Sequence, residues 1–280
     1  MELTHIAAAD FDLAMTLDSG QVFHWARKDR GFVGAIAETA VYIQQEGDSL
    51  KFAGASAKTI ARYFALDHAL LEICASFPDD AIMNEARDFC RGLRIIRQPK
   101  WECLATFICS SMKQVAHIRQ ISDALRQRFG KAKQICAHKI FTFPSAERLA
   151  CATEKELREC ALGYRAKNLL GTAQRIAADE ADLEAWSKLP DSALRTQLCQ
   201  LPGVGAKVAN CVMLFAYERV AAFPIDVWIE RVLRQQYFAG KKKVTSKTMA
   251  EFAESYFGPH GGYAQQYLFH HARMAKRKQV

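Results

Sequence analysis

The sequence lacks the residue patterns that mark several classes of protein. None of its 9 cysteines forms a C-x-x-C pair, and no compact run of four is present, which argues against zinc and iron–sulfur sites. No apolar run is long enough to span a membrane as a helix, so we expect no membrane association. Only 7 of the 280 residues are proline and half are hydrophobic, which indicates a folded chain rather than a disordered one.

The N-terminus also lacks a targeting signal, because no basic region precedes its apolar residues. The odd number of cysteines is typical of buried thiols in a reducing compartment, so we expect an intracellular protein. What is in excess is positive charge: 38 Lys and Arg against 30 Asp and Glu give a net charge of +8. This excess favours a polyanionic partner, although an ordinary basic enzyme is about equally compatible with it.

The chain divides into a β-prone part and a helical part. Short β-prone segments separated by polar turns lie at 22–28, 31–37, 39–45 and 49–55 and predict an antiparallel sheet. From about residue 59 the apolar spacing is helical, and further helices are predicted at 81–92, 101–112, 114–129, 146–151, 154–162, 166–178, 191–200, 206–217, 227–237, 246–257 and 262–276. We expect an α+β fold, with a sheet domain over 1–80 and a helical region over 81–280.

The stretch LPGVG between two predicted helices indicates a helix-hairpin-helix over residues 191–217. Gly203 and Gly205 allow the backbone to approach another chain closely, and the free amides of the following helix form a phosphate site. A plain turn between two helices, closed by a C-capping glycine, explains the same pattern about equally well.

Lys207 falls in the first turn of the second helix, where the helix dipole disfavours a cation. It is either a surface lysine near phosphates or a nucleophile that this position makes easier to deprotonate. Asp226, in FPIDVW, is expected first of all to cap the helix that follows it. A carboxylate at a helix N-terminus stays ionised, so it can also orient an amine and offset positive charge on a sugar.

Two pairs of residues, each four apart, share a helix face: Lys207 with Cys211, and Gln265 with Phe269. A ring, a polarisable thiol and an amide together suit a flat heterocycle that has a Watson–Crick edge. Taken separately, Cys211 and Phe269 are more typical of a protein core.

These motifs resemble those of the helix-hairpin-helix–Gly/Pro–Asp DNA glycosylases, in the elements LPGVGAKVANC and FPIDVW. The elements RQPKWECLATFICSS, LGYRAK and GPHGGYAQQYLF are similar to the 8-oxoguanine DNA glycosylase branch, and the similarity covers nearly the whole chain. It implies a TATA-binding-protein-like sheet domain and double-stranded DNA containing oxidised guanine as the partner; for a protein that wraps around one kinked duplex we expect a monomer. It implies no cofactor and no metal, and a location in the cytoplasm and nucleoid of a prokaryote or the nucleus of a eukaryote.

The resemblance also implies roles for the site residues. Lys207 would attack the sugar of a flipped nucleotide, form a Schiff base and nick the strand by β-elimination, with Asp226 stabilising the transition state. The Gly20 carbonyl would accept the N7 hydrogen that only the oxidised base carries. Gln265 would contact the Watson–Crick edge, with Cys211 and Phe269 on the two faces of the ring.

Around this pocket, Tyr164 would fill the gap left by the flipped nucleotide, and Arg165 would donate to the orphaned cytosine. Met112 and His117 stand where cytosine-specific members carry an asparagine and an arginine. Methionine cannot donate a hydrogen bond, and neutral histidine offers one donor where an arginine guanidinium offers several. We therefore expect a weaker preference for cytosine opposite the lesion. Two further departures are Trp228, in place of a phosphate-binding histidine, and Ala272, in place of an acid near the pocket.

Two alternatives remain open. A monofunctional glycosylase for another damaged base, such as an alkylated one, would lack the catalytic lysine, so Lys207 counts against it. A non-catalytic helix-hairpin-helix protein would use Lys207 only as a phosphate contact, and Lys207→Gln would then weaken binding modestly without removing an activity.

Overall fold

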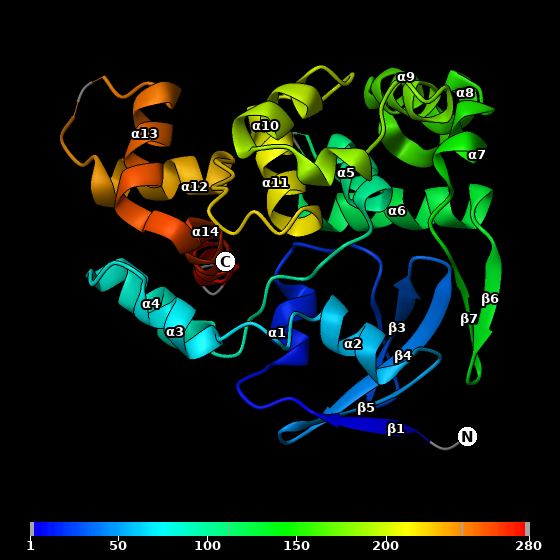
Figure 1. The fold of residues 1–280 in the computed structure, drawn as a ribbon, viewed down its shortest axis with the longest axis horizontal. Coiled ribbons are helices and arrows are strands. Elements are labelled where there is room, and N and C mark those ends of the chain that lie inside the picture. Colours follow the sequence, from blue (N-terminus) through cyan, green and yellow to red (C-terminus); the bar gives the residue numbers. More distant parts are fainter. Residues whose placement is uncertain (1–2, 112, 242, 278–280) are drawn as a thin grey trace.

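Five strands near the N-terminus form one antiparallel sheet in the computed structural model, which describes residues 3–111, 113–241 and 243–277 (Figure 1). Their spatial order is β1-β5-β4-β3-β2. The strands are β1 (Thr4–Ala7), β2 (Ala26–Lys28), β3 (Gly31–Ile36), β4 (Thr39–Glu46) and β5 (Ser49–Ala53). Each of the four predicted segments contains a strand and the α+β class is confirmed, whereas β1 was not predicted.

Both faces of this sheet are covered, which explains the uninterrupted apolar run in β4. On one face, Val41 and Ile43 pack with residues of α1 (Leu13–Asp18) and α2 (Ala57–Tyr63) in a core of their own. On the other face, Tyr42 packs against a second, two-stranded sheet formed by β6 (Ala132–Ile135) and β7 (His138–Phe141). A strand buried on both faces has no polar side to alternate with.

The β6–β7 hairpin is absent from the sequence prediction, which expected only helices after residue 59. Its turn places Cys136 at a φ of 51°, a conformation that glycine or asparagine more often occupies. The turn therefore carries none of the residues that usually indicate a hairpin. In Figure 1 the hairpin runs down one side of the molecule and reaches the sheet.

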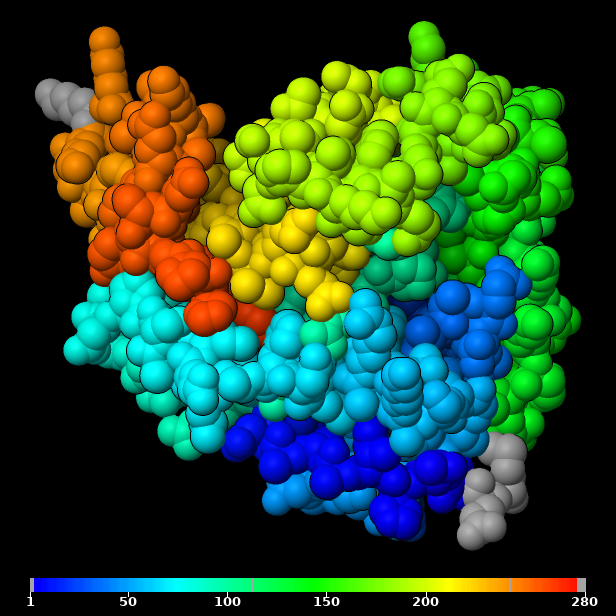
Figure 2. Space-filling model, in the orientation of Figure 1, coloured from blue at the N-terminus to red at the C-terminus, as the bar shows by residue number. Residues whose placement is uncertain are grey.

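The remaining helices fall in the predicted helical stretches, and from α4 onward most ends agree with the prediction within a few residues. They are α3 (Leu70–Ala75), α4 (Ala81–Phe89), α5 (Lys100–Cys109), α6 (Val115–Phe129), α7 (Ala146–Ala150), α8 (Glu154–Leu157), α9 (Arg165–Ala177), α10 (Asp191–Cys199), α11 (Ala206–Ala216), α12 (Val227–Val232), α13 (Ser246–Phe257) and α14 (Gly261–Arg277). The predicted helix 227–237 continues past α12 as a wider helical turn at Leu233–Tyr237, whereas the predicted helix 154–162 ends in a kink, because Ala161 has a φ of 62°. At the surface, a notch separates α13 from α10 (Figure 2).

Helix α14 links the end of the chain to its beginning. Its Tyr263 and Tyr267 are fully buried, and the Tyr267 hydroxyl donates to the Leu93 carbonyl at 3.0 Å. The amide of Gln266 donates to the Ser19 carbonyl at 3.1 Å. Residues close to position 20 are therefore held directly by the last helix. The domain division at residue 80 stays a prediction, and Leu70 of α3 already belongs to the larger, helical core.

Candidate active site

The hairpin between α10 and α11 exposes its backbone. Gly203 has a φ of +79°, and a Cβ there would lie 2.7 Å from the Asn168 side chain, so only glycine fits this turn. Gly205 caps α11 in an extended conformation, and a Cβ there would meet no described atom within 4 Å. Gly203 is required by the fold, whereas the absence of a side chain at Gly205 leaves open space at the helix N-terminus.

Lys207 lies at the junction of α11 and α5. Its Nζ donates to the Ser110 Oγ at 3.0 Å and stands 5.1 Å from the centre of the Phe107 ring. The Ser110 hydroxyl in turn donates to the Phe107 carbonyl at 2.7 Å, which leaves its lone pairs for the amine. The half-buried amine is therefore held in place by residues that precede it by about a hundred positions.

Cys211 lies one helical turn after Lys207 and is 4% exposed. Burial raises the pKa of the Cys211 thiol to about 11, an effect that the nearby Lys207 charge partly opposes. The thiol is therefore neutral at physiological pH, and it presents a polarisable, uncharged surface.

Asp226 is the N-cap of α12, as predicted. Its Oδ1 accepts hydrogen bonds from the amides of Trp228 at 3.0 Å and Ile229 at 2.9 Å. Burial raises the pKa of the Asp226 carboxyl, and the amide donors and the Lys207 charge only partly offset that effect. Lys207 therefore lies close enough to Asp226 for the two charges to interact.

Gln265 and Phe269 lie on the buried side of α14. The Gln265 side chain is 4% exposed, and its Oε1 accepts no hydrogen bond from the part of the chain that the structure describes. A buried amide oxygen without a donor costs free energy, which a ligand with N–H groups would recover. Phe269 borders Gly20, because a Cβ on Gly20 would lie 3.1 Å from its ring.

Comparison with known proteins identifies the family to which the chain belongs. Residues 4–104 match the N-terminal domain of 8-oxoguanine DNA glycosylase, and residues 105–256 match the helix-hairpin-helix–Gly/Pro–Asp superfamily of base excision DNA repair proteins. The chain belongs to the 8-oxoguanine DNA glycosylase family of this superfamily.

Relatives of this family are similar over most of the chain. The N-glycosylase/DNA lyase of Saccharomyces cerevisiae is 30% identical, over 83% of this chain and 70% of that protein. The Arabidopsis thaliana enzyme of the same type is 29% identical, over 96% of this chain and 78% of that protein. The Clostridium acetobutylicum 8-oxoguanine glycosylase/lyase, in complex with double-stranded DNA that holds cytosine opposite 8-oxoguanine, is 30% identical. That structure superposes with a TM-score of 0.90 and covers 99% of this chain and 100% of its own.

The residues expected to contact DNA around the glycosylase pocket differ in exposure. Tyr164 is 57% exposed, as a residue that enters a duplex should be, and His117 is also exposed. Arg165 is 5% exposed; it stacks on Tyr164 and donates to the Ser111 carbonyl. Trp228 is half-buried, with the Arg231 guanidinium 5.3 Å from its ring centre. Met112 lies outside the described residues.

The contacts join the predicted residues of the glycosylase into two groups. Lys207, Cys211 and Asp226 interact with one another, and Gly20 borders Phe269. The placement of a base between Cys211 and Phe269 stays a prediction. The partners Ser110 and Phe107 were not predicted, although both lie in the motif FICSS, whose position at a helix end favours such contacts. No helix of the described residues is long and apolar enough to cross a membrane.

Proposed function

We propose that this chain excises 8-oxoguanine from duplex DNA and then cleaves the strand, with Lys207 as the nucleophile of both steps. The observation that carries the proposal is the convergence on one site of the Lys207 amine held by Ser110, the buried Cys211 thiol and the Asp226 carboxylate at a helix N-terminus, together with a buried Gln265 oxygen that accepts no hydrogen bond from the described residues. A guanine-type base presents N1–H and N2–H on its Watson–Crick edge, and these are the donors that Gln265 needs.

In the first step, the deprotonated Lys207 nitrogen forms a bond to C1′ of the flipped nucleotide. The bond from C1′ to N9 of the base breaks, and the base leaves with the electron pair and takes up the proton that the newly formed secondary ammonium gives up, which restores the lone pair on the Lys207 nitrogen. Positive charge develops on the sugar as the bond weakens, and the Asp226 carboxylate stabilises it. The backbone amides of Trp228 and Ile229 donate to Oδ1 and so fix the orientation of that carboxylate.

In the second step, the nitrogen lone pair opens the bond between C1′ and the ring oxygen, which gives a Schiff base. Loss of a proton from C2′ then expels the 3′ phosphate by β-elimination. Hydrolysis of the imine releases Lys207. The strand is therefore cleaved because the nucleophile is an amine, which can form a Schiff base. With water as the nucleophile, the reaction would end at the abasic site.

For base selection, we propose that the Gly20 carbonyl accepts from N7–H of the oxidised base. Unmodified guanine would instead present a lone pair to that carbonyl and would leave two acceptors facing each other. For the opposite base, Met112 and His117 offer fewer donors than an asparagine and an arginine, so Arg165 would supply most of the preference for cytosine. Arg165 must then exchange its bond to the Ser111 carbonyl for one to the base.

The test is borohydride trapping on duplexes that hold one 8-oxoguanine opposite each of the four bases in turn. We expect a covalent adduct with the wild-type protein and none with Lys207→Gln, with comparable adduct yields across the four partners. DNA binding without any adduct would indicate a monofunctional enzyme or a binding protein. A strong preference for cytosine alone would contradict only the opposite-base proposal.

A further inference from the structure

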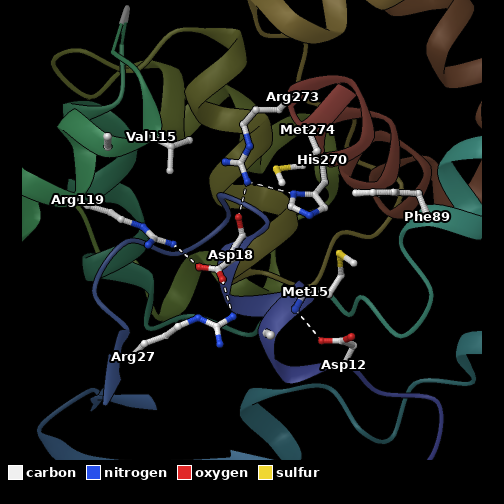
Figure 3. Close-up of a pocket in the computed structure, with 12 residues that line it drawn as sticks. Asp12, Met15, Asp18, Arg27, Phe89, Val115, Arg119, His270, Arg273 and Met274 are labelled. Carbon is white, nitrogen blue, oxygen red and sulfur yellow. Dashed lines mark hydrogen bonds and ion pairs between the residues drawn. The ribbon is translucent and has the colours of Figure 1, made fainter. Parts of the chain in front are cut away.

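Arg273 lies on α14 four residues after Phe269 and eight after Gln265, on the same face of the helix. Although it is an arginine, its side chain is only 9% exposed. Its guanidinium stands 5.4 Å from the centre of the Phe269 ring, and it donates to the backbone carbonyl of Asp18 (Figure 3). A second contact, of 3.1 Å, joins it to Nδ1 of His270.

The same guanidinium borders Gly20. A Cβ built on Gly20 would lie 2.6 Å from the Arg273 Nη1, closer than two unbonded atoms can approach. Gly20 also has a φ of +88°, which favours glycine. Arg273 thus touches both the residue whose carbonyl would select the base and the ring that would cover it.

The segment before Gly20 has weaker supports from other elements. The Asp18 carboxylate accepts from Arg27 of the β2 strand at 3.2 Å and from Arg119 of α6 at 3.0 Å. These side chains are exposed or half-buried, and ion pairs of that kind contribute little to the free energy of folding. The partly buried hydrogen bond from Arg273 to the Asp18 backbone is the strongest restraint of these three.

On its other side, this segment faces an open cavity of about 420 Å³. Asp18, Val115, Arg119 and Arg273 are among the residues that line it, whereas Lys207 and Gln265 are not (Figure 3). Asp18, at the start of the turn that carries Gly20, therefore borders open space, whereas Ser19 and Gln21 are fully buried. Arg273 is the contact that holds the turn on its Asp18 side, while Gln266 holds the Ser19 carbonyl.

We propose that Arg273 is a positioning residue for base recognition, which holds the Gly20 carbonyl and the Phe269 ring at the spacing that a flat purine needs. This inference rests on the proposed function, because it concerns the same pocket. The contacts of Arg273 with the Asp18 carbonyl and the Phe269 ring place it at the base-recognition side of the pocket, so we infer that it serves recognition of the base rather than the chemistry at the sugar.

The experiment separates these two parts of the reaction. One substrate holds 8-oxoguanine, and the other holds a preformed abasic site, which has no base to recognise. For Arg273→Met we expect kcat/KM for 8-oxoguanine excision to fall by about tenfold or more, since small displacements of recognition groups carry such losses. Cleavage of the abasic site should change by less than about twofold. Arg273→Lys, which keeps a donor for the Asp18 carbonyl, should recover part of the excision.

The matched control is Arg148→Met. Arg148 also stands 5.4 Å from the centre of a phenylalanine ring, that of Phe129, but it lies on α7 at the surface. It should leave both activities unchanged. Equal losses on the two substrates with Arg273→Met would show a general structural role and overturn the inference, as would unchanged excision. Failure of the wild-type protein to excise 8-oxoguanine would instead overturn the proposed function.

Discussion

At the scale of single residues, Asp226 is subject to two opposing influences. Its carboxylate caps a helix, which favours the charged form, but it is also buried, which disfavours that form. Burial has the larger effect, so its pKa lies above the ordinary carboxyl value of 3.8. The protein therefore keeps a charge at this position at the expense of folding stability.

Asp226→Asn should accordingly separate stability from activity. Above the raised pKa, the folded protein holds a charge that the unfolded chain carries more easily, so ionisation lowers stability. Asparagine keeps an oxygen for the cap and removes the charge. We expect an unchanged thermal midpoint or one higher by up to about 4 °C at neutral pH, with excision reduced at least about 100-fold.

Thermal denaturation at several pH values measures the first effect. The difference in thermal midpoint between Asp226→Asn and the wild type should shrink as the pH falls toward 4, because the wild-type carboxyl is then protonated and no longer carries the charge that lowers its stability. Asp226→Ala, which also removes the cap, is the comparison and should be the less stable variant. A midpoint for Asp226→Asn as low as that of Asp226→Ala would contradict the argument.

Most residues to which we assign a chemical role could be proposed from local motifs, since Lys207, Cys211 and Asp226 lie in short stretches with typical spacing. Ser110 and Arg273 could not, because each acts on a residue that is remote in the sequence. Arg273 did leave a signal: it continues the four-residue spacing of Gln265 and Phe269. A charged residue at that spacing on an otherwise buried helix face indicates that its charge is hydrogen-bonded or paired within the protein.

At the scale of elements, the hairpin before α11 offers a direct comparison of two glycines. Gly203→Ala should cost about 1–3 kcal/mol of folding free energy, because a side chain there is strained and meets Asn168. Gly205→Ala should change stability by no more than about 1 kcal/mol, since its Cβ points into open space.

Gly205→Ala should instead weaken the binding of duplex DNA. If the amides at the start of α11 hold a phosphate, a methyl group at Gly205 would disturb that approach. Loss of one hydrogen bond to a charged group corresponds to a decrease in affinity of about tenfold. Chemical denaturation and duplex binding at one fixed salt concentration measure the two effects. Wild-type affinity in Gly205→Ala would contradict the phosphate contact.

Helices were easier to predict than strands because their spacing extends over many residues. The β6–β7 hairpin was missed because β6 is mostly exposed and packs through Ile135 alone. The helical stretch after residue 59 is two helices, because Ala65, at a φ of 50°, ends the first. Such a conformation at alanine depends on tertiary packing and has no local signal.

At the scale of the whole molecule, a buried ionic cluster joins the sheet to the helices. Glu102 of α5 pairs with Arg126 of α6, and its Oε1 lies 3.1 Å from Nδ1 of His24, which precedes β2. His24 also contacts the Ala35 carbonyl of β3, at 2.8 Å. Burial lowers the pKa of His24 well below its usual value and raises that of Glu102.

Removal of one partner should therefore destabilise the whole protein. Glu102→Ala leaves the Arg126 guanidinium buried without its carboxylate, and we expect a loss of about 3–5 kcal/mol in the free energy of unfolding. Glu154→Ala breaks a surface pair with Arg158 and should cost about 0.5 kcal/mol or less. Denaturant titration of both variants measures the difference. Equal effects would contradict a joining role for the cluster.

The position of α14 has a consequence for the order in which the protein becomes competent during synthesis. Lys207 leaves the ribosome well before Gln265, Phe269 and Arg273, whereas Gly20 has long since been made. With the roles proposed above, a chain that stops between these points would carry the nucleophile without the helix that completes base recognition. Selective excision would then have to wait until α14 has packed against the residues near position 20.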